Sequence, residues 1–210
     1  MSSPAPHSGD LVVIGASTGG PRAVQTLLEA LPASFDACII VALHMPALFT
    51  GPYAGRLDRT SGMNVQEARG GEKVQTGSVL ILPGGSQGSV VPAGDSGVLR
   101  LRRKKDEELY APSADVLMCS AASTLGRTVV GVLLTGMGED GHQGLAAIRA
   151  AGGFTLAESR DSAVVYGMPG GAVRAGAVNR ELKLGEIPGA LVARCGLRHL
   201  PPGKDAPTPD

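Results

Sequence analysis

Short apolar runs alternate with amphipathic segments along most of the chain. The apolar runs are rich in Val, Ile and Leu, as buried strands are, and they occupy residues 11–14, 38–43, 129–134 and 154–157. Segments with apolar positions at helical spacing lie at 21–31, 47–59, 113–125 and 141–151. This alternation predicts βαβ units, and therefore a doubly wound, Rossmann-like α/β fold in which helices flank a mainly parallel sheet.

The middle of the chain departs from this alternation. Strand-like stretches at 63–67, 78–82, 89–91 and 98–102 are separated by glycine-rich turns, with no helical pattern between them. We expect a small antiparallel excursion here. Beyond it, the pattern predicts a helix after residues 167–169, a last strand at 177–182 and a closing helix at 185–194.

Length and composition narrow the class of protein. The 210 residues suffice for one domain, expected over 10–196, whereas 1–9 and 197–210 are expected to be disordered. Nineteen Lys and Arg balance nineteen Asp and Glu, which disfavours a nucleic-acid partner. The apolar stretch near the N-terminus is too short to cross a bilayer and has no basic leader, so we expect no membrane insertion. Three scattered cysteines predict neither a disulfide framework nor a zinc site, and they indicate a cytoplasmic protein.

The most informative segment is LVVIGASTGG, at residues 11–20. A dinucleotide fingerprint needs a glycine where Ser17 stands, and a P-loop needs a lysine that this turn lacks. A Gly-x-Ser-x-Gly elbow over residues 15–19 remains, and it would expose Ser17 at the end of a strand as a nucleophile. The alternative is that Ser17 only caps the following helix.

A serine, a histidine and an aspartate follow three of the predicted strands. Ser17 follows the first, His44 the second, and Asp140 lies in the glycine-rich loop after the strand at 129–134. Because the carboxyl ends of parallel strands meet at one edge, we expect these side chains to converge. A base that removes the serine proton, supported by a carboxylate, is what an acyl-transfer nucleophile requires.

Other assignments stay open at this point. His44 could be a structural histidine, and Asp140 could be the N-cap of the next helix. His142 is a competing base, ranked second because the positive end of a helix disfavours imidazolium. The chain order Ser, His, Asp argues against an α/β-hydrolase, which runs Ser, Asp, His. The other candidate acids are Asp115, Glu139 and Asp161.

Seven motifs, taken together, resemble the catalytic domain of the CheB family, the bacterial chemotaxis protein-glutamate methylesterases. The resemblance extends from about residue 11 to residue 194. The motifs are VIGASTGGP (13–21), HMPALFT (44–50), RLD (56–58), LPGG (82–85), APSADVLMCSAA (111–122), GVLLTGMGEDG (131–141) and VVYGMPGGA (164–172).

This resemblance implies a doubly wound sheet with an antiparallel β-hairpin near the active site. It implies a catalytic triad of Ser17, His44 and Asp140, and an oxyanion and substrate-binding region lined by Thr18, Gly19 and Met137. The implied reaction is hydrolysis of γ-glutamyl methyl esters on methyl-accepting chemoreceptors, together with deamidation of receptor glutamines. No metal or organic cofactor is required. The basic stretch 100–105 would meet acidic receptor helices.

The chain also departs from the family pattern. Only about ten residues precede the first predicted strand, so we expect no receiver domain in this sequence and a separate receiver protein as regulator. Leu43, Gln87 and residues 158–161 differ from what relatives carry, and we expect altered substrate contacts with the chemistry retained. Two alternatives remain, a receptor-binding module without turnover and an esterase for small soluble esters.

Overall fold

A computed structural model describes residues 10–197 of the chain. Its centre is a sheet of seven strands in the order β3-β4-β2-β1-β7-β8-β9, and every neighbouring pair is parallel. The mainly parallel sheet predicted from the apolar runs is thereby confirmed. The strands are β1 (Asp10–Ala16), β2 (Ala37–Leu43), β3 (Asn64–Glu67), β4 (Ser78–Ile81), β7 (Val129–Leu133), β8 (Phe154–Glu158) and β9 (Arg180–Leu182).

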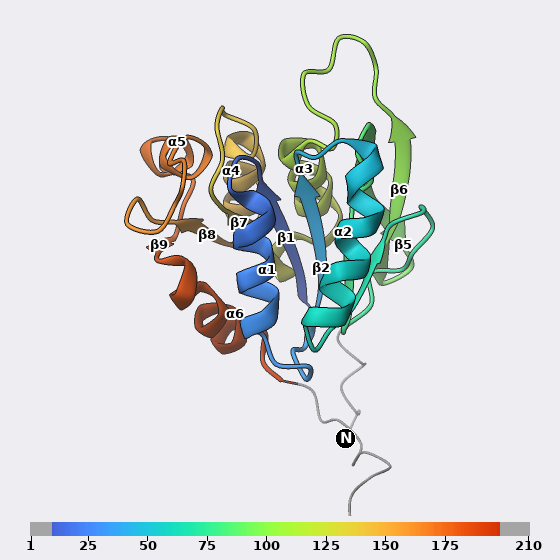
Figure 1. The fold of residues 1–210 in the computed structure, drawn as a ribbon, viewed down its shortest axis with the longest axis horizontal. Coiled ribbons are helices and arrows are strands. Elements are labelled where there is room, and N and C mark those ends of the chain that lie inside the picture. Colours follow the sequence, from blue (N-terminus) through green and yellow to red (C-terminus); the bar gives the residue numbers. More distant parts are fainter. Residues whose placement is uncertain (1–9, 198–210) are drawn as a thin grey trace, which may run out of the picture.

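Helices cover both faces of the sheet (Figure 1). α1 (Gly20–Ala30), α2 (Ala47–Thr60) and α6 (Ile187–Cys195) pack on one face, against strand residues such as Val12 and Ile14. The other face carries α3 (Ala114–Leu125), α4 (His142–Ala150) and α5 (Met168–Arg174), against residues such as Leu11 and Val13. Successive side chains of a strand point to opposite faces, so a strand covered on both sides must be apolar throughout. Two short 3₁₀ helices complete the elements, η1 (Gly126–Thr128) and η2 (Leu184–Glu186).

A separate antiparallel hairpin consists of β5 (Ser86–Ala93) and β6 (Ser96–Arg103). Val90 and Leu99 from the hairpin join the core on the α3 side of the sheet. Two hydrogen bonds anchor the hairpin to α3, one from Val90 N–H to Ser120 Oγ (3.0 Å) and one from Thr124 Oγ1 to the Val90 carbonyl (3.0 Å).

The predicted antiparallel excursion was wrong in its extent. Only its second half forms the hairpin, whereas β3 and β4 pair in parallel and extend the main sheet. The reason lies in residues 68–77, which do not form a tight turn between β3 and β4. This connection instead follows β6, where Gly71 N–H donates to Leu99 O (2.7 Å) and Val74 N–H donates to Gly97 O (2.8 Å).

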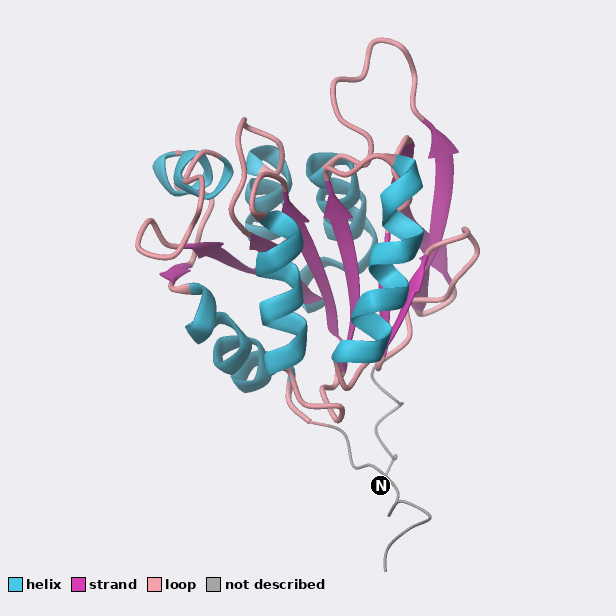
Figure 2. Cartoon of the chain, viewed as in Figure 1, coloured by secondary structure: helices cyan, strands magenta, loops and turns pink. Residues whose placement is uncertain are grey.

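The strand order creates a switch point between β1 and β7, because the chain leaves β1 toward β2 on one side and returns to β7 on the other. Ligands of open parallel sheets bind beyond the carboxyl ends of the strands at such a point. Loops gather at this edge, above the arrowheads of β1 and β2 (Figure 2).

Two predictions about the ends of the chain fall mostly outside the described residues. Residues 1–9 and 198–210 are not described, and Leu197 forms an isolated bridge with Phe35. Between residues 10 and 197, no helix combines the length and the apolar character needed to cross a bilayer.

Candidate active site

Ser17 lies in the turn that joins β1 to α1. Its N–H donates to the carbonyl of Thr135 (3.0 Å), and its carbonyl accepts from Gly20 N–H (2.7 Å). Gly136, in the loop after β7, allows this loop to lie close to the Ser17 turn. A Cβ at position 136 would lie 2.9 Å from Ser17 Cβ and 2.3 Å from Met168 Sδ. Within the described part of the chain, the partly exposed Ser17 hydroxyl has no hydrogen-bond partner. The turn therefore presents this hydroxyl at the switch point.

His44 lies beside Ser17 in the continuation of β2. β1 and β2 are in register so that Ala16 is opposite Leu43, and His44 N–H donates to Ala16 O (3.0 Å). The imidazole Nε2 is 2.7 Å from Asp140 Oδ2. The structure thus joins His44 to Asp140 directly, and it places Ser17 on the adjacent strand end without a hydrogen bond between Ser17 and His44 among the described contacts.

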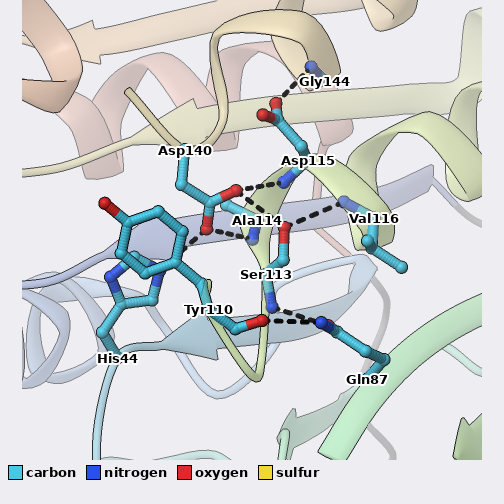
Figure 3. Close-up of polar contacts among 9 residues, drawn as sticks. All are labelled: His44, Gln87, Tyr110, Ser113, Ala114, Asp115, Val116, Asp140 and Gly144. Carbon is cyan, nitrogen blue, oxygen red and sulfur yellow. Dashed lines mark hydrogen bonds and ion pairs between the residues drawn. The ribbon is translucent and has the colours of Figure 1, made fainter. Parts of the chain in front are cut away.

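Asp140 is buried and accepts four hydrogen bonds (Figure 3). Besides His44, its donors are Ser113 Oγ (2.7 Å) and the N–H groups of Ala114 (2.7 Å) and Asp115 (3.0 Å). The two N–H groups belong to the first turn of α3, where unpaired backbone donors and the helix dipole favour an anion. Asp140 therefore binds the start of α3 and the imidazole at the same time.

Burial alone would raise the pKa of the Asp140 carboxyl, but hydrogen bonds from His44, Asp115, Ser113 and Ala114 outweigh it, and the pKa lies below its usual value. The carboxylate is consequently ionised at neutral pH and can only accept hydrogen bonds. This assigns the proton of neutral His44 to Nε2 and leaves Nδ1 with the lone pair. A base with a defined tautomer is what proton removal from Ser17 needs.

The structure places the competing residues in other roles. His142 Nε2 is 2.8 Å from the Met168 carbonyl, so this ring packs under α5. Asp140 does not cap α4, whose N-cap is Gly141. Among the described contacts, the other candidate acids do not bond to His44. Asp115 accepts a hydrogen bond from Gly144 N–H (2.7 Å), and burial raises the pKa of its carboxyl. Asp161 forms an ion pair with Lys183 (3.5 Å), and Glu139 is exposed.

The loop after β7 shapes the region expected to hold an oxyanion. Thr135 Oγ1 donates to the carbonyl of Thr18 (2.9 Å), and Thr135 N–H donates to the buried Glu158 (2.8 Å). Among the described contacts, the N–H groups of Thr18, Gly19 and Met137 have no acceptor. Gly19 has φ 80°, in the left-handed region that glycine adopts readily. Thr18 and Gly19 directly follow Ser17, and Met137 lies in the loop after β7, which contacts the Ser17 turn through the bond from Ser17 N–H to Thr135 O.

Three residues that contact or support the His44–Asp140 pair were not assigned this role from the sequence. Ser113 was predicted only as a helix start, although a Ser N-cap does signal an anion-binding helix terminus. Tyr110 stacks on the His44 ring with centroids 4.4 Å apart and an angle of 7° between the planes. Gln87, expected to contact substrate, is buried and bonds to the segment that carries Tyr110 and Ser113. No local sequence signal marks Tyr110, because the contact joins segments more than sixty residues apart.

Two cavities lie beside the His44–Asp140 pair. One of about 410 Å³ is lined by residues that include Gln87, Tyr110 and Asp140. The other, of about 310 Å³, lies between the His44–Pro46 segment and the loop from Lys104 to Ala111. Across residues 10–197, no three His, Cys, Asp or Glu side chains are grouped to hold a metal ion.

Comparisons with known proteins identify relatives over most of the chain. A Geobacter sulfurreducens protein named protein-glutamate methylesterase/protein-glutamine glutaminase 3 is 44% identical over 188 residues, which are 90% of this chain and 51% of that protein. A Myxococcus xanthus protein named protein-glutamate methylesterase/protein-glutamine glutaminase 1 is 46% identical over 183 residues, covering 87% of this chain and 53% of the relative. The chain therefore spans about half the length of the curated relatives it matches.

The fold agrees as well. The crystal structure of the Thermotoga maritima CheB methylesterase catalytic domain has a TM-score of 0.85 and 36% identity, over 89% of this chain and 98% of that one. It confirms the predicted doubly wound fold with its separate hairpin. The family model described as CheB methylesterase matches residues 12–191. The chain belongs to the CheB methylesterase family.

Proposed function

We propose that this chain hydrolyses γ-glutamyl methyl esters on methyl-accepting chemoreceptors, with Ser17 as nucleophile, His44 as general base and Asp140 as its supporting carboxylate. One observation carries the proposal: the 2.7 Å contact between His44 Nε2 and the ionised Asp140, at the strand end next to Ser17. The names of the relatives supply the type of bond, a methyl ester of a protein glutamate.

The proposed first step is attack of Ser17 Oγ on the ester carbonyl while His44 Nδ1 takes the hydroxyl proton. A positioned general base contributes about 10²–10⁴-fold to the rate. The imidazolium that forms faces Asp140, whose charge stabilises it and whose hydrogen bond holds the ring.

Negative charge then develops on the ester oxygen. The backbone N–H groups of Thr18, Gly19 and Met137 are the donors that we propose for it, because among the described contacts none of them has another acceptor. Losing one such donor typically costs about 3 kcal/mol of transition-state stabilisation. Collapse of the intermediate breaks the C–O bond, and His44 donates its proton to the departing methanol.

Water completes the reaction. His44 removes a proton from a water molecule that attacks the acyl-enzyme. It then donates this proton to Ser17 Oγ as the bond from Ser17 to the acyl carbon breaks, which releases Ser17 and a glutamate side chain. A glutamine side chain fits the same sequence of steps with ammonia as the leaving group, so we propose deamidation as a second activity of this site.

Large apolar side chains around the site favour a protein substrate over a small soluble ester. Leu48 and Phe49 are exposed in the first turn of α2, Leu109 precedes Tyr110, and Met137 is 71% exposed. Exposed apolar side chains that gather in one region mark surfaces that contact other proteins, whereas single ones do not. Since the proposed substrate is the cytoplasmic helical bundle of the receptor, we also propose a cytoplasmic site of action.

The test is methanol release from receptor-containing membranes with isotope-labelled methyl esters. We expect release by the wild type, a loss of at least about 10³-fold in Ser17→Ala, and unchanged release in Ser123→Ala, an exposed serine on α3. Equal release by wild type and Ser17→Ala would disprove the nucleophile assignment. Faster turnover of small soluble methyl esters than of receptors would contradict the substrate class.

A further inference from the structure

The aromatic ring of Tyr110 covers one face of the His44 imidazole. The ring centroids are 4.4 Å apart and the planes are 7° from parallel (Figure 3). Tyr110 belongs to the segment between β6 and α3, 66 residues beyond His44, and the reaction proposed above does not use it. A flat ring against the imidazole restricts rotation about the His44 side chain, which the single hydrogen bond to Asp140 does not do alone.

Gln87 fixes the segment that carries Tyr110. This buried side chain projects from β5; its Nε2 donates to the Tyr110 carbonyl (2.6 Å), and its Oε1 accepts from Ser113 N–H (2.9 Å). One amide thus holds both ends of residues 110–113. The strand that carries Gln87 is itself bonded to α3 through Val90.

The segment that carries Tyr110 also holds Asp140, the hydrogen-bond partner of His44. Ser113 Oγ and the Ala114 N–H donate to Asp140, three and four residues after the ring that covers His44. The positions of the imidazole and the carboxylate are therefore set by one short stretch of backbone. Gly138 leaves room for the Tyr110 hydroxyl, because a Cβ at that glycine would lie 2.6 Å from it.

We propose that Tyr110 is a positioning residue for the general base His44, and that Gln87 is the residue through which the β5–β6 hairpin holds Tyr110 in place. The hairpin is then a scaffold for the His44–Asp140 pair. This inference rests on the proposed function in one respect, the role of His44 as base.

The first experiment uses Tyr110→Phe and Tyr110→Leu in the full chain. Tyr110→Phe keeps the ring and should keep kcat within about threefold, whereas Tyr110→Leu should lower kcat about 10- to 100-fold with little change in KM, the range expected for a displaced catalytic group. Thermal unfolding of both variants shows that they are folded. A kcat for Tyr110→Leu within twofold of the wild type, or an equal loss in Tyr110→Phe, would overturn the proposal.

The second readout needs no substrate. In protein labelled at the histidine rings, the His44 ring protons should be shifted upfield by the stacked ring, with the resonance assigned by its loss in His44→Gln. The shift should persist in Tyr110→Phe and vanish in Tyr110→Leu; a wild-type shift that survives in Tyr110→Leu contradicts the stacking role. If the wild type releases no methanol while this pattern holds, the proposed function fails and the positioning of His44 by Tyr110 stands.

The Gln87 part has its own test. Gln87→Met removes both hydrogen bonds with a side chain of similar size and should lower kcat while leaving KM similar. Because Gln87 acts partly through Tyr110, adding Gln87→Met to Tyr110→Leu should lower kcat by a smaller factor than Gln87→Met does alone. Equal factors in the two backgrounds would show that Gln87 and Tyr110 act independently and would refute this part.

Discussion

Asp140→Asn separates the two tasks of the buried carboxylate. Asp140 Oδ1 accepts from Ser113 and Asp115, and Oδ2 accepts from His44 and Ala114. An asparagine of the same shape has one acceptor oxygen and one NH₂ donor in these places. Whichever way the amide is turned, its NH₂ faces a backbone N–H, at Asp115 in one orientation and at Ala114 in the other.

The cost in stability follows from that unpaired donor. A buried N–H without an acceptor costs about 2 kcal/mol, which lowers Tm by about 4–8 °C for a chain of this size. Folded domains are usually stable by about 5–15 kcal/mol, so we expect the variant to stay folded.

The cost in activity is larger. If the asparagine NH₂ points toward His44, His44 Nε2 must accept its hydrogen bond, so the imidazole proton moves to Nδ1 and Nδ1 can no longer take a proton from Ser17. If the NH₂ points away, the imidazolium formed during the reaction has no negative charge beside it. We expect kcat to fall by about 10²–10⁴-fold. KM should stay similar because Asp140 is buried.

The assay pairs methanol release with thermal unfolding, and Ser113→Ala is the matched control. Ser113→Ala removes one hydrogen bond to Asp140 and the cap on Val116 N–H, which costs about 1–2 kcal/mol, but it keeps the charge and the contact with His44. Its kcat should fall less than about tenfold. If Asp140→Asn lowers Tm but keeps kcat within tenfold of the wild type, Asp140 only anchors α3 and the reasoning is wrong.

Acid unfolding gives an independent readout of the same carboxylate. The pKa of Asp140 is lowered in the folded state, so its contribution to stability is complete above the unfolded pKa of about 3.9 and is lost as pH falls through the lower folded value. The wild-type free energy of unfolding should therefore decrease on acidification below about pH 4. Asp140→Asn should show a shallower decrease in urea titrations over that range, and an identical slope would contradict the shifted pKa.

Two further predictions concern the site's surroundings. His44→Ala should lower kcat by about 10²–10⁴-fold. His142→Ala loses the bond to Met168 O, so it should lower Tm but keep kcat within about tenfold of the wild type. If His142→Ala loses more activity than His44→Ala in the methanol assay, His142 is the base. Gly136→Ala should lower the free energy of unfolding by about 1–3 kcal/mol and reduce kcat, because the added Cβ would press on Ser17. Gly185→Ala is the control: no atom lies within 4 Å of its added Cβ, so stability and kcat should both stay unchanged. Normal turnover by Gly136→Ala would show that the Ser17 turn tolerates displacement.

The parallel sheet was predictable because its signal is local. Continuous apolar runs such as 38–43 indicate a strand buried on both faces, and the helical segments between the runs force parallel connections. The pairing of β3 with β4 was not predictable. Their connection looks like hairpin turns in sequence, and its hydrogen bonds to β6 exist only in the folded chain.

The candidate site divides in the same way. The sequence by itself determined that a serine, a histidine and an aspartate follow strands whose carboxyl ends share one edge, because strand direction and strand ends are encoded locally. Only the tertiary structure decided that His44 pairs with Asp140 and not with Asp115, that His142 packs under α5, and that Tyr110 covers the imidazole. Those choices depend on side-chain directions across segments up to 96 residues apart, which packing sets and no local pattern records.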